Sequence, residues 1–251
     1  MTTTVIEIAP EVFQINYFNN YHVSQYLIRD EYPTMVGTGL NCSFEEVQQA
    51  VRKLVDPSTL RYLCIPWMAM DQCGSLNRFL ALAPKAEPVT SFIGANVVIG
   101  DFSDRPARTL GDGERLELGA KTLVGVLTPW VPSWDGMMFF DETDGVLFTG
   151  DLFVNQRDPK YPITDDDADA AKEIVVGMQQ SAVIPSTAFL EAALQKFEKL
   201  AIKTLAPHHG PLLTGNPAAY YRLLRENTVA DMVDAPFPKG NFAFIKEASP
   251  A

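Results

Sequence analysis

Two successive sets of strand-like segments, each followed by helical segments, constrain the fold of this chain more than any other feature of its sequence. Alternating apolar residues, or short apolar runs bounded by turn residues, indicate strands. Two such sheets bury most apolar surface when they pack face to face with their helices outside. We therefore expect an α/β fold with two sheets between two helical layers. The expected strands cover 5–9, 12–18, 25–30, 61–65, 88–92, 114–118, 121–128, 136–143, 145–151 and 202–207.

Helix ends are marked by residues that can cap free backbone groups. A capping-box pattern, in which Ser43 precedes Glu46, predicts the start of a helix. Ser186 is expected to cap another helix in the same way. The run Asp165–Asp167 is interpreted as favourable carboxylates at a helix N-terminus rather than as a metal site. The expected helices cover 43–55, 74–82, 166–180 and 186–200, and a last one begins near Pro217.

Composition limits the class of protein. The 251 residues are 47% hydrophobic and 20% charged, which suits one large domain over 1–251, and no domain boundary or repeat is visible. A net charge of −11 argues against nucleic-acid or anionic-membrane partners. We expect a cytoplasmic protein, because no apolar stretch of membrane-spanning length and no signal peptide is present. Three unpaired cysteines, Cys42, Cys64 and Cys73, predict neither disulfides nor a cysteine zinc site.

Polar residues follow three of the expected strands, where rigid scaffolds commonly place functional groups. Asp71 and Gln72 come after the strand at 61–65, Asp151 ends the segment GVLFTGD, and His208 and His209 follow the strand at 202–207. Each alone has an ordinary structural explanation. Together they form the candidate site of this chain.

In this order, the segments DQCGSL, TPWVPSWDGM, LFTGD and PHHGP resemble the four motifs of the metallo-β-lactamase superfamily. Within it, the loop length, the GSL and GDGERLELG segments and the early NNYHVSQYLI look most like flavodiiron proteins and the shorter oxygen-binding diiron proteins. The resemblance covers nearly the whole chain and implies a four-layer αββα sandwich. No flavodoxin module is expected within 1–251, so the chain is more similar to the oxygen-binding diiron type.

The resemblance also assigns two metal positions. The ligands of the family's first iron fall on Trp67, Ala69 and Pro132, none of which coordinates a metal. The ligands of the second metal fall on four residues that retain oxygen or nitrogen donors. These are Asp71, Gln72, Asp151 and His209.

Two functions follow from this broken pattern. The first is a non-catalytic pseudoenzyme that binds a small molecule or a protein, and the second is a mononuclear metalloprotein that binds oxygen or hydrolyses a small substrate. Accordingly we expect no cofactor or one weakly held Fe, Mn or Zn ion, no bound flavin, and no assigned catalytic residue. The resemblance implies a homodimer and a redox partner protein.

The remaining candidate residues belong to the expected pocket. Replacement of ligands by apolar side chains predicts an aromatic site beside the two carboxylates, suited to a small ligand with a cationic or donor group. The alternative is that the tryptophans fill the vacated volume. The pocket candidates are Trp67, Ala69, Trp130, Pro132, His22 and His208.

Overall fold

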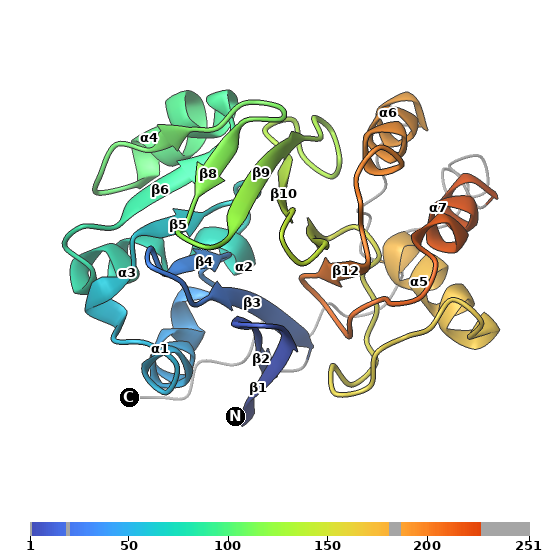
Figure 1. Cartoon of the computed structure of the whole chain (residues 1–251), viewed down its shortest axis with the longest axis horizontal. Coiled ribbons are helices and arrows are strands. Elements are labelled where there is room, and N and C mark those ends of the chain that lie inside the picture. The colour runs from blue at the N-terminus through green and yellow to red at the C-terminus, as the bar shows by residue number, and fades with distance from the viewer. Residues whose placement is uncertain (1, 19–20, 181–186, 227–251) are drawn as a thin grey trace.

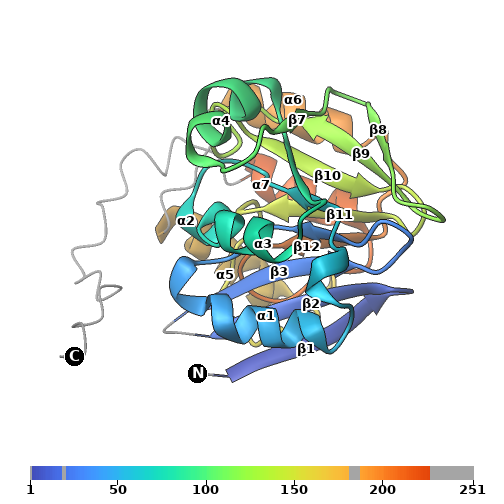
Figure 2. The same cartoon turned by 90° about the vertical axis from the view of Figure 1, so that its left-hand side faces the viewer.

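The computed structural model describes residues 2–18, 21–180 and 187–226. Figure 1 shows two sheets side by side, with α1, α3 and α4 outside one of them and α5, α6 and α7 outside the other. Figure 2 views the first sheet from its helical side, with α1 and α3 in front of it. The prediction of two sheets between two helical layers is confirmed.

The first sheet has seven strands in sequence order. Its first four strands form an antiparallel meander, and β4 to β7 are parallel to one another because helical segments return the chain between them. The strands are β1 (Thr2–Ala9), β2 (Val12–Phe18), β3 (His22–Ile28), β4 (Thr34–Val36), β5 (Tyr62–Cys64), β6 (Glu87–Thr90) and β7 (Arg108–Thr109).

The second sheet has five strands in the order β12-β11-β10-β9-β8. Only β11 and β12 are parallel, so their carboxyl ends lie side by side. The strands are β8 (Arg115–Glu117), β9 (Thr122–Leu127), β10 (Met137–Asp141), β11 (Val146–Gly150) and β12 (Thr204–Pro207).

The helical layers contain more short elements than the sequence predicted. The segment 94–102 is helical, with a π-helical turn at Gly94–Val98, and a one-turn helix precedes α3. No helix of the described ranges is long and apolar enough to cross a membrane. The helices are α1 (Phe44–Arg52), α2 (Met70–Cys73), α3 (Leu76–Leu82), α4 (Ile99–Phe102), α5 (Ala168–Gln180), α6 (Thr187–Phe197) and α7 (Pro217–Glu226).

Three apolar cores hold the four layers together. Alternate residues of β10 show how one strand serves two of them: Phe139 packs between the sheets, whereas Phe140 packs against the outer helices. The third core lies between the first sheet and α1 and α3, and includes Leu27 and Phe79. Because β10 is buried on both faces, its first four residues are an unbroken apolar run.

The predicted capping box at Ser43 is wrong. Ser43 ends a 3₁₀ turn at Asn41–Ser43, and its hydroxyl donates to the Leu40 carbonyl instead of accepting from the first turn of α1. The carboxylate expected before α5 is confirmed, since Asp167 accepts a 2.9 Å hydrogen bond from the Ala170 amide. Ser186 lies outside the described residues.

A buried tyrosine ties the two sheets together. The Tyr26 hydroxyl on β3 donates a 2.6 Å hydrogen bond to the Pro207 carbonyl at the end of β12. Tyr26→Phe leaves that buried carbonyl without this donor, so we expect the free energy of unfolding to fall by about 1–2 kcal/mol in urea denaturation. Tyr32→Phe, at an exposed ring, should change it by less than about 0.5 kcal/mol. Equal effects of the two substitutions would contradict the link.

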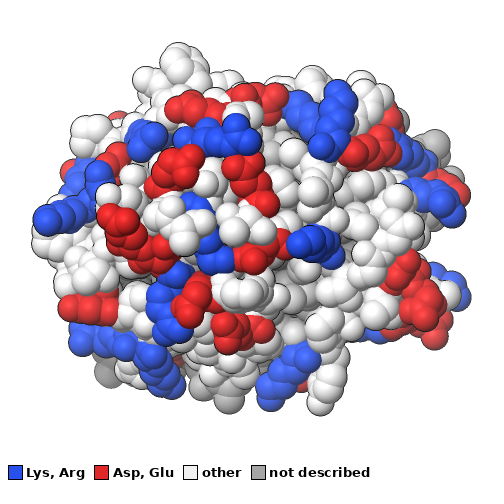
Figure 3. Space-filling view, viewed as in Figure 1, with Lys and Arg blue, Asp and Glu red and all other residues white. Residues whose placement is uncertain are grey.

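Charged side chains of both signs are interspersed on the face shown in Figure 3. No extended basic patch is visible on that face. The absence of nucleic-acid partners stays a prediction, which rests on the net charge of −11.

Candidate functional site

The site forms where three segments meet at strand ends. In the parallel pair β11–β12, the His208 amide donates a 2.7 Å hydrogen bond to the Gly150 carbonyl, which sets Asp151 beside His209. The third segment is α2 from the first half of the chain, which supplies Asp71 and Gln72. The structure therefore brings together the four residues assigned to the second metal position.

The loop that carries His208 and His209 is anchored by hydrogen bonds from other elements. Each of its four consecutive carbonyls, from Pro207 to Gly210, accepts a hydrogen bond from another element. The donors, in order, are the Tyr26 hydroxyl (2.6 Å), the Ser24 amide (2.7 Å), the Asn155 amide (3.3 Å) and the Gln14 side chain (3.2 Å). Sequence reasoning missed these residues. The available signal was the polar set Gln14, Asn16, Ser24, which recurs at period two in otherwise apolar strands.

His209 is the centre of the polar cluster. Its Nε2 lies 3.2 Å from Asp71 Oδ2 and 3.5 Å from Asp151 Oδ1, and its Nδ1 donates a 2.6 Å hydrogen bond to the His22 carbonyl. The Gln72 amide lies 3.5 Å from the same Asp151 oxygen. One imidazole thus contacts two carboxylates and the backbone of β3.

The charges of this cluster balance one another. Burial lowers the pKa of His209, but the hydrogen bond to Asp71 and the charges of Asp151 and Asp71 outweigh burial and raise it to about 9. Burial raises the pKa of Asp71, yet its contact with His209 holds it below the ordinary value. For Asp151, burial dominates and its pKa is raised. Within this cluster a His209 cation pairs first with Asp71.

His208 lies closer to the cluster than the sequence suggested. Its Nε2 donates a 3.0 Å hydrogen bond to the Asp71 carbonyl, and burial lowers the pKa of His208 to about 3, so the ring is neutral. Among the described residues, Asp71, His208 and His209 form a group whose ligand atoms all lie within 4.8 Å of one another. His208 therefore orients Asp71 through its backbone.

Trp67 lies at the end of β11, over the residue that precedes Asp151. Its side chain is 3% exposed and packs directly over Gly150, where an added Cβ would lie 2.0 Å from the indole Cζ3. Ala69 and Pro132 are partly buried and carry no donor side chain. The indole thus fills space at the end of β11, next to Asp151.

The other pocket candidates lie apart from the cluster. Trp130 is 51% exposed, and its ring centroid lies 6.2 Å from that of Phe189 on α6. The His22 ring bonds to Asn16 and lines a cavity of about 210 Å³ together with Asp158 and Lys160, so only its carbonyl contacts His209. The aromatic ligand pocket stays a prediction.

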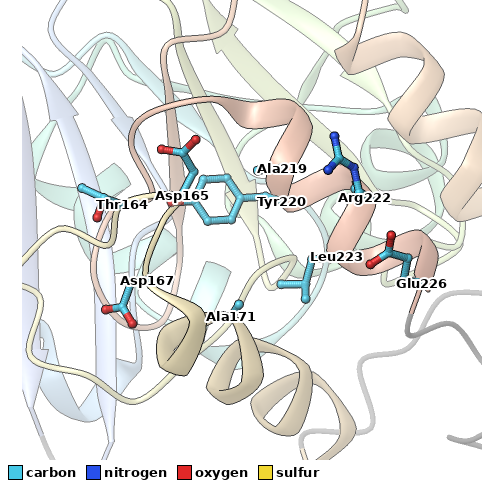
Figure 4. A pocket seen from close by; sticks show the side chains of 9 residues that line it. All are labelled: Thr164, Asp165, Asp167, Ala171, Ala219, Tyr220, Arg222, Leu223 and Glu226. Atoms are coloured by element: carbon cyan, nitrogen blue, oxygen red, sulfur yellow. The ribbon is translucent and has the colours of Figure 1, made fainter.

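A further hollow of about 130 Å³ lies between the 164–167 loop, α5 and α7, and Figure 4 shows Tyr220 projecting across it. Its lining contains Asp165 and Asp167 from the loop and Arg222 from α7. None of the candidate site residues lines it. Asp167 is already paired with Arg157, so this hollow is a feature of helix packing rather than part of the site.

The four-layer fold and the cluster at its strand ends define a protein of the metallo-β-lactamase fold. The model of the ODP family of β-lactamases matches residues 21–210. This chain therefore belongs to the ODP β-lactamase family.

Individual relatives agree with this assignment. A Nostoc sp. protein named diflavin flavoprotein A 1 is 31% identical over 204 residues, which cover 78% of this chain and 34% of that protein. The flavo-diiron protein FprA2 of Clostridium acetobutylicum is 22% identical over 213 residues, which cover 81% of this chain and 52% of that protein. The flavodiiron core of Flv1 from Synechocystis sp. shares the fold, with a TM-score of 0.79 at 19% identity over 90% of this chain and 60% of that one. The chain spans about half or less of the curated relatives' length.

These relatives correct the cofactor prediction. No cofactor, or one weakly held ion, and no flavin were expected from the sequence. Relatives of this chain are named as flavo-diiron and diflavin proteins, so the expectation of no cofactor or one weakly held ion conflicts with these homologues. The prediction was wrong because it was drawn from the missing ligands alone.

The residues present fit the two iron positions unequally. At the first, Trp67 fills the space beside Gly150, and neither Ala69 nor Pro132 offers a donor, so a two-iron centre does not fit. At the second, the 3.2 and 3.5 Å spacings around His209 Nε2 are close to the roughly 3.3 Å between ligands of a tetrahedral ion with bonds of about 2.0–2.1 Å. A metal ion at this second position would be held by the cluster itself.

Proposed function

We propose that this chain is a member of the ODP family that does not reduce oxygen or nitric oxide at a two-iron centre and acts as a ligand- or partner-binding domain. The observation that carries the proposal is the position of Trp67, whose indole packs on Gly150 where the resemblance places the first iron's ligands. A two-metal reaction needs donors on both sides of the reacting molecule. In this chain the Trp67 indole stands on one of these two sides in place of metal-binding donors.

The proposal assigns the polar side of the binding site to Asp71, Gln72, Asp151 and His209. Two carboxylates and one imidazolium present alternating charge within 3.5 Å, which suits a ligand with a cationic or hydrogen-bond-donating group. If an ion enters, these four side chains are the ones that would hold it. The homodimer and the cytoplasmic location remain predictions, the first of which light scattering would check.

Turnover of the iron-loaded protein tests the proposal. We expect protein treated anaerobically with Fe(II) to consume oxygen or nitric oxide no faster than a protein-free control when photoreduced flavin mononucleotide supplies electrons. Asp151→Asn is the matched control, because it removes a carboxylate between both metal positions. Consumption by the wild-type protein at about 1 s⁻¹ or faster, abolished by Asp151→Asn, would show that the chain is an enzyme and overturn the proposal.

A further inference from the structure

A cavity of about 210 Å³ lies at the β1 edge of the first sheet, and its lining shares no side chain with the polar cluster. One of its walls is a single face of three strands. Asn16 on β2 is the register partner of Thr4 on β1. Phe18, two residues further along β2 and therefore on the same face, is the partner of His22 on β3. Strand pairing thus fixes these lining side chains relative to one another.

A second wall comes from the turn that carries Asp158 and Lys160. The Asp158 carboxylate accepts a 3.0 Å hydrogen bond from the Lys160 amide, which fixes the acidic side chain in this turn. Within residues 2–18, 21–180 and 187–226, neither the Lys160 ammonium nor the Asp158 carboxylate has an ion-pair partner. One positive and one negative group at the wall of the cavity are therefore available to pair with a bound molecule.

The imidazole of His22 adds a hydrogen-bond acceptor to this pair of charges. The Asn16 side-chain amide donates a 3.1 Å hydrogen bond to Ser24, so its oxygen accepts the 2.9 Å hydrogen bond from His22 Nδ1. A neutral imidazole that carries its proton on Nδ1 has a lone pair on Nε2. The Phe18 ring, whose centroid lies 4.7 Å from that of His22, packs on the imidazole and offers apolar surface. His22 Nε2 thus remains available to an N–H group of a ligand.

These groups define the chemical class of the ligand. An ammonium and a carboxylate in one wall match a molecule that carries both a carboxylate and an ammonium group, and charge-assisted hydrogen bonds are about twice as strong as neutral ones. Such a zwitterion has no net charge, so the net charge of −11 does not repel it as it would repel a simple anion. The cavity is smaller than the roughly 300–1,000 Å³ of sites for drug-sized ligands, which indicates a small molecule.

We propose that this cavity binds a free α-amino acid with a small apolar side chain. The Lys160 ammonium pairs with the carboxylate of the amino acid. The Asp158 carboxylate and His22 Nε2 accept hydrogen bonds from its ammonium group, and its side chain lies on the Phe18 ring. This site is separate from the one in the proposed function, because the His22 ring lines the cavity whereas only the His22 carbonyl contacts the polar cluster.

Isothermal titration calorimetry of the full chain with L-valine tests this site. We expect saturable binding of one valine per chain. Isobutylamine lacks the carboxylate and isovalerate lacks the ammonium group, so each should bind at least about tenfold more weakly. Lys160→Met should raise the Kd for L-valine about tenfold, whereas Lys85→Met, at an exposed lysine outside the cavity lining, should leave it unchanged. Circular dichroism checks that both variants are folded.

Nitrogen-15 NMR of the imidazole rings locates the bound valine, because the chain has three histidines. We expect L-valine to shift the His22 Nε2 signal more than any ring signal of His208 or His209. A largest shift at His209 would place valine in the polar cluster and overturn the proposal. Absence of saturable heat at about 10 mM L-valine, or equal affinity for valine and isovalerate, would overturn it as well.

Discussion

Gly150→Ala is expected to lower the free energy of unfolding by about 3–4 kcal/mol. An added methyl group would lie 2.0 Å from Cζ3 and 2.2 Å from Cη2 of the buried Trp67 indole, so the ring or the strand end must move, which costs about 1–3 kcal/mol. The φ of +57° at Gly150 adds about 1–2 kcal/mol for any residue with a Cβ. Chemical denaturation at fixed pH measures the sum.

Gly113→Ala is the matched control for this substitution. Gly113 has a φ of +72° but nothing within 4 Å of an added Cβ, so only the backbone strain of about 1 kcal/mol should appear. In a double-mutant cycle, Trp67→Ala should remove the contact and give a coupling energy of about 2 kcal/mol with Gly150→Ala. Equal losses at Gly150 and Gly113 would show that the indole does not occupy this space.

The stability of chelator-treated protein should fall by about 3 kcal/mol as the pH rises from about 6.5 to 9. The pKa of His209 is raised from 6.5 to about 9 in the folded protein, so its contribution is complete below pH 6.5 and is lost as the pH rises through 9. The raised pKa of Asp151 acts in the same direction at lower pH. Asp71, with a lowered pKa, loses its contribution only on acidification.

The two adjacent histidines provide the control. His209→Gln should flatten the alkaline fall, because it removes the group that holds the extra proton. His208 has a pKa lowered to about 3, so its effect on stability appears between pH 6.5 and 3, and His208→Gln should keep the alkaline fall. Urea denaturation at a series of pH values distinguishes them. If the free energy of unfolding of His209→Gln still falls at alkaline pH, another titrating group is responsible for the fall.

Much of the fold was predictable because its strands carry strong local patterns. The apolar run at β10 follows from burial on both faces. The alternation in β2 indicated a strand correctly, although its polar residues Gln14 and Asn16 are buried as well. The short elements were not predictable. The helical turns at Met70–Cys73 and Gly94–Val98 are too brief for a periodic pattern, and tertiary contacts determine them.

The candidate site was predictable as a set of residues but not as an arrangement. Strand-end positions indicated Asp71, Asp151 and His209, and the structure places His209 Nε2 3.2 Å from Asp71 and 3.5 Å from Asp151. The sequence could not show that His208 holds the backbone of Asp71, since that contact joins residues 137 apart. The left-handed backbone of Trp130 was equally hidden, because no glycine or asparagine marks it.

The position of His209 between the two sheets has a consequence for the order of folding. His22 and Asp71 come from the half of the chain that forms the first sheet, whereas Asp151 and His209 come from the half that forms the second. The contacts of His209 with Asp71 and His22 join residues far apart in sequence. Forming such contacts requires closing a long loop, which costs conformational entropy and slows folding. The hydrogen bond with Asp71, which raises the pKa of His209 more than any other contact, forms only when the two halves meet. We therefore expect proton uptake near neutral pH to accompany the docking of the two sheets.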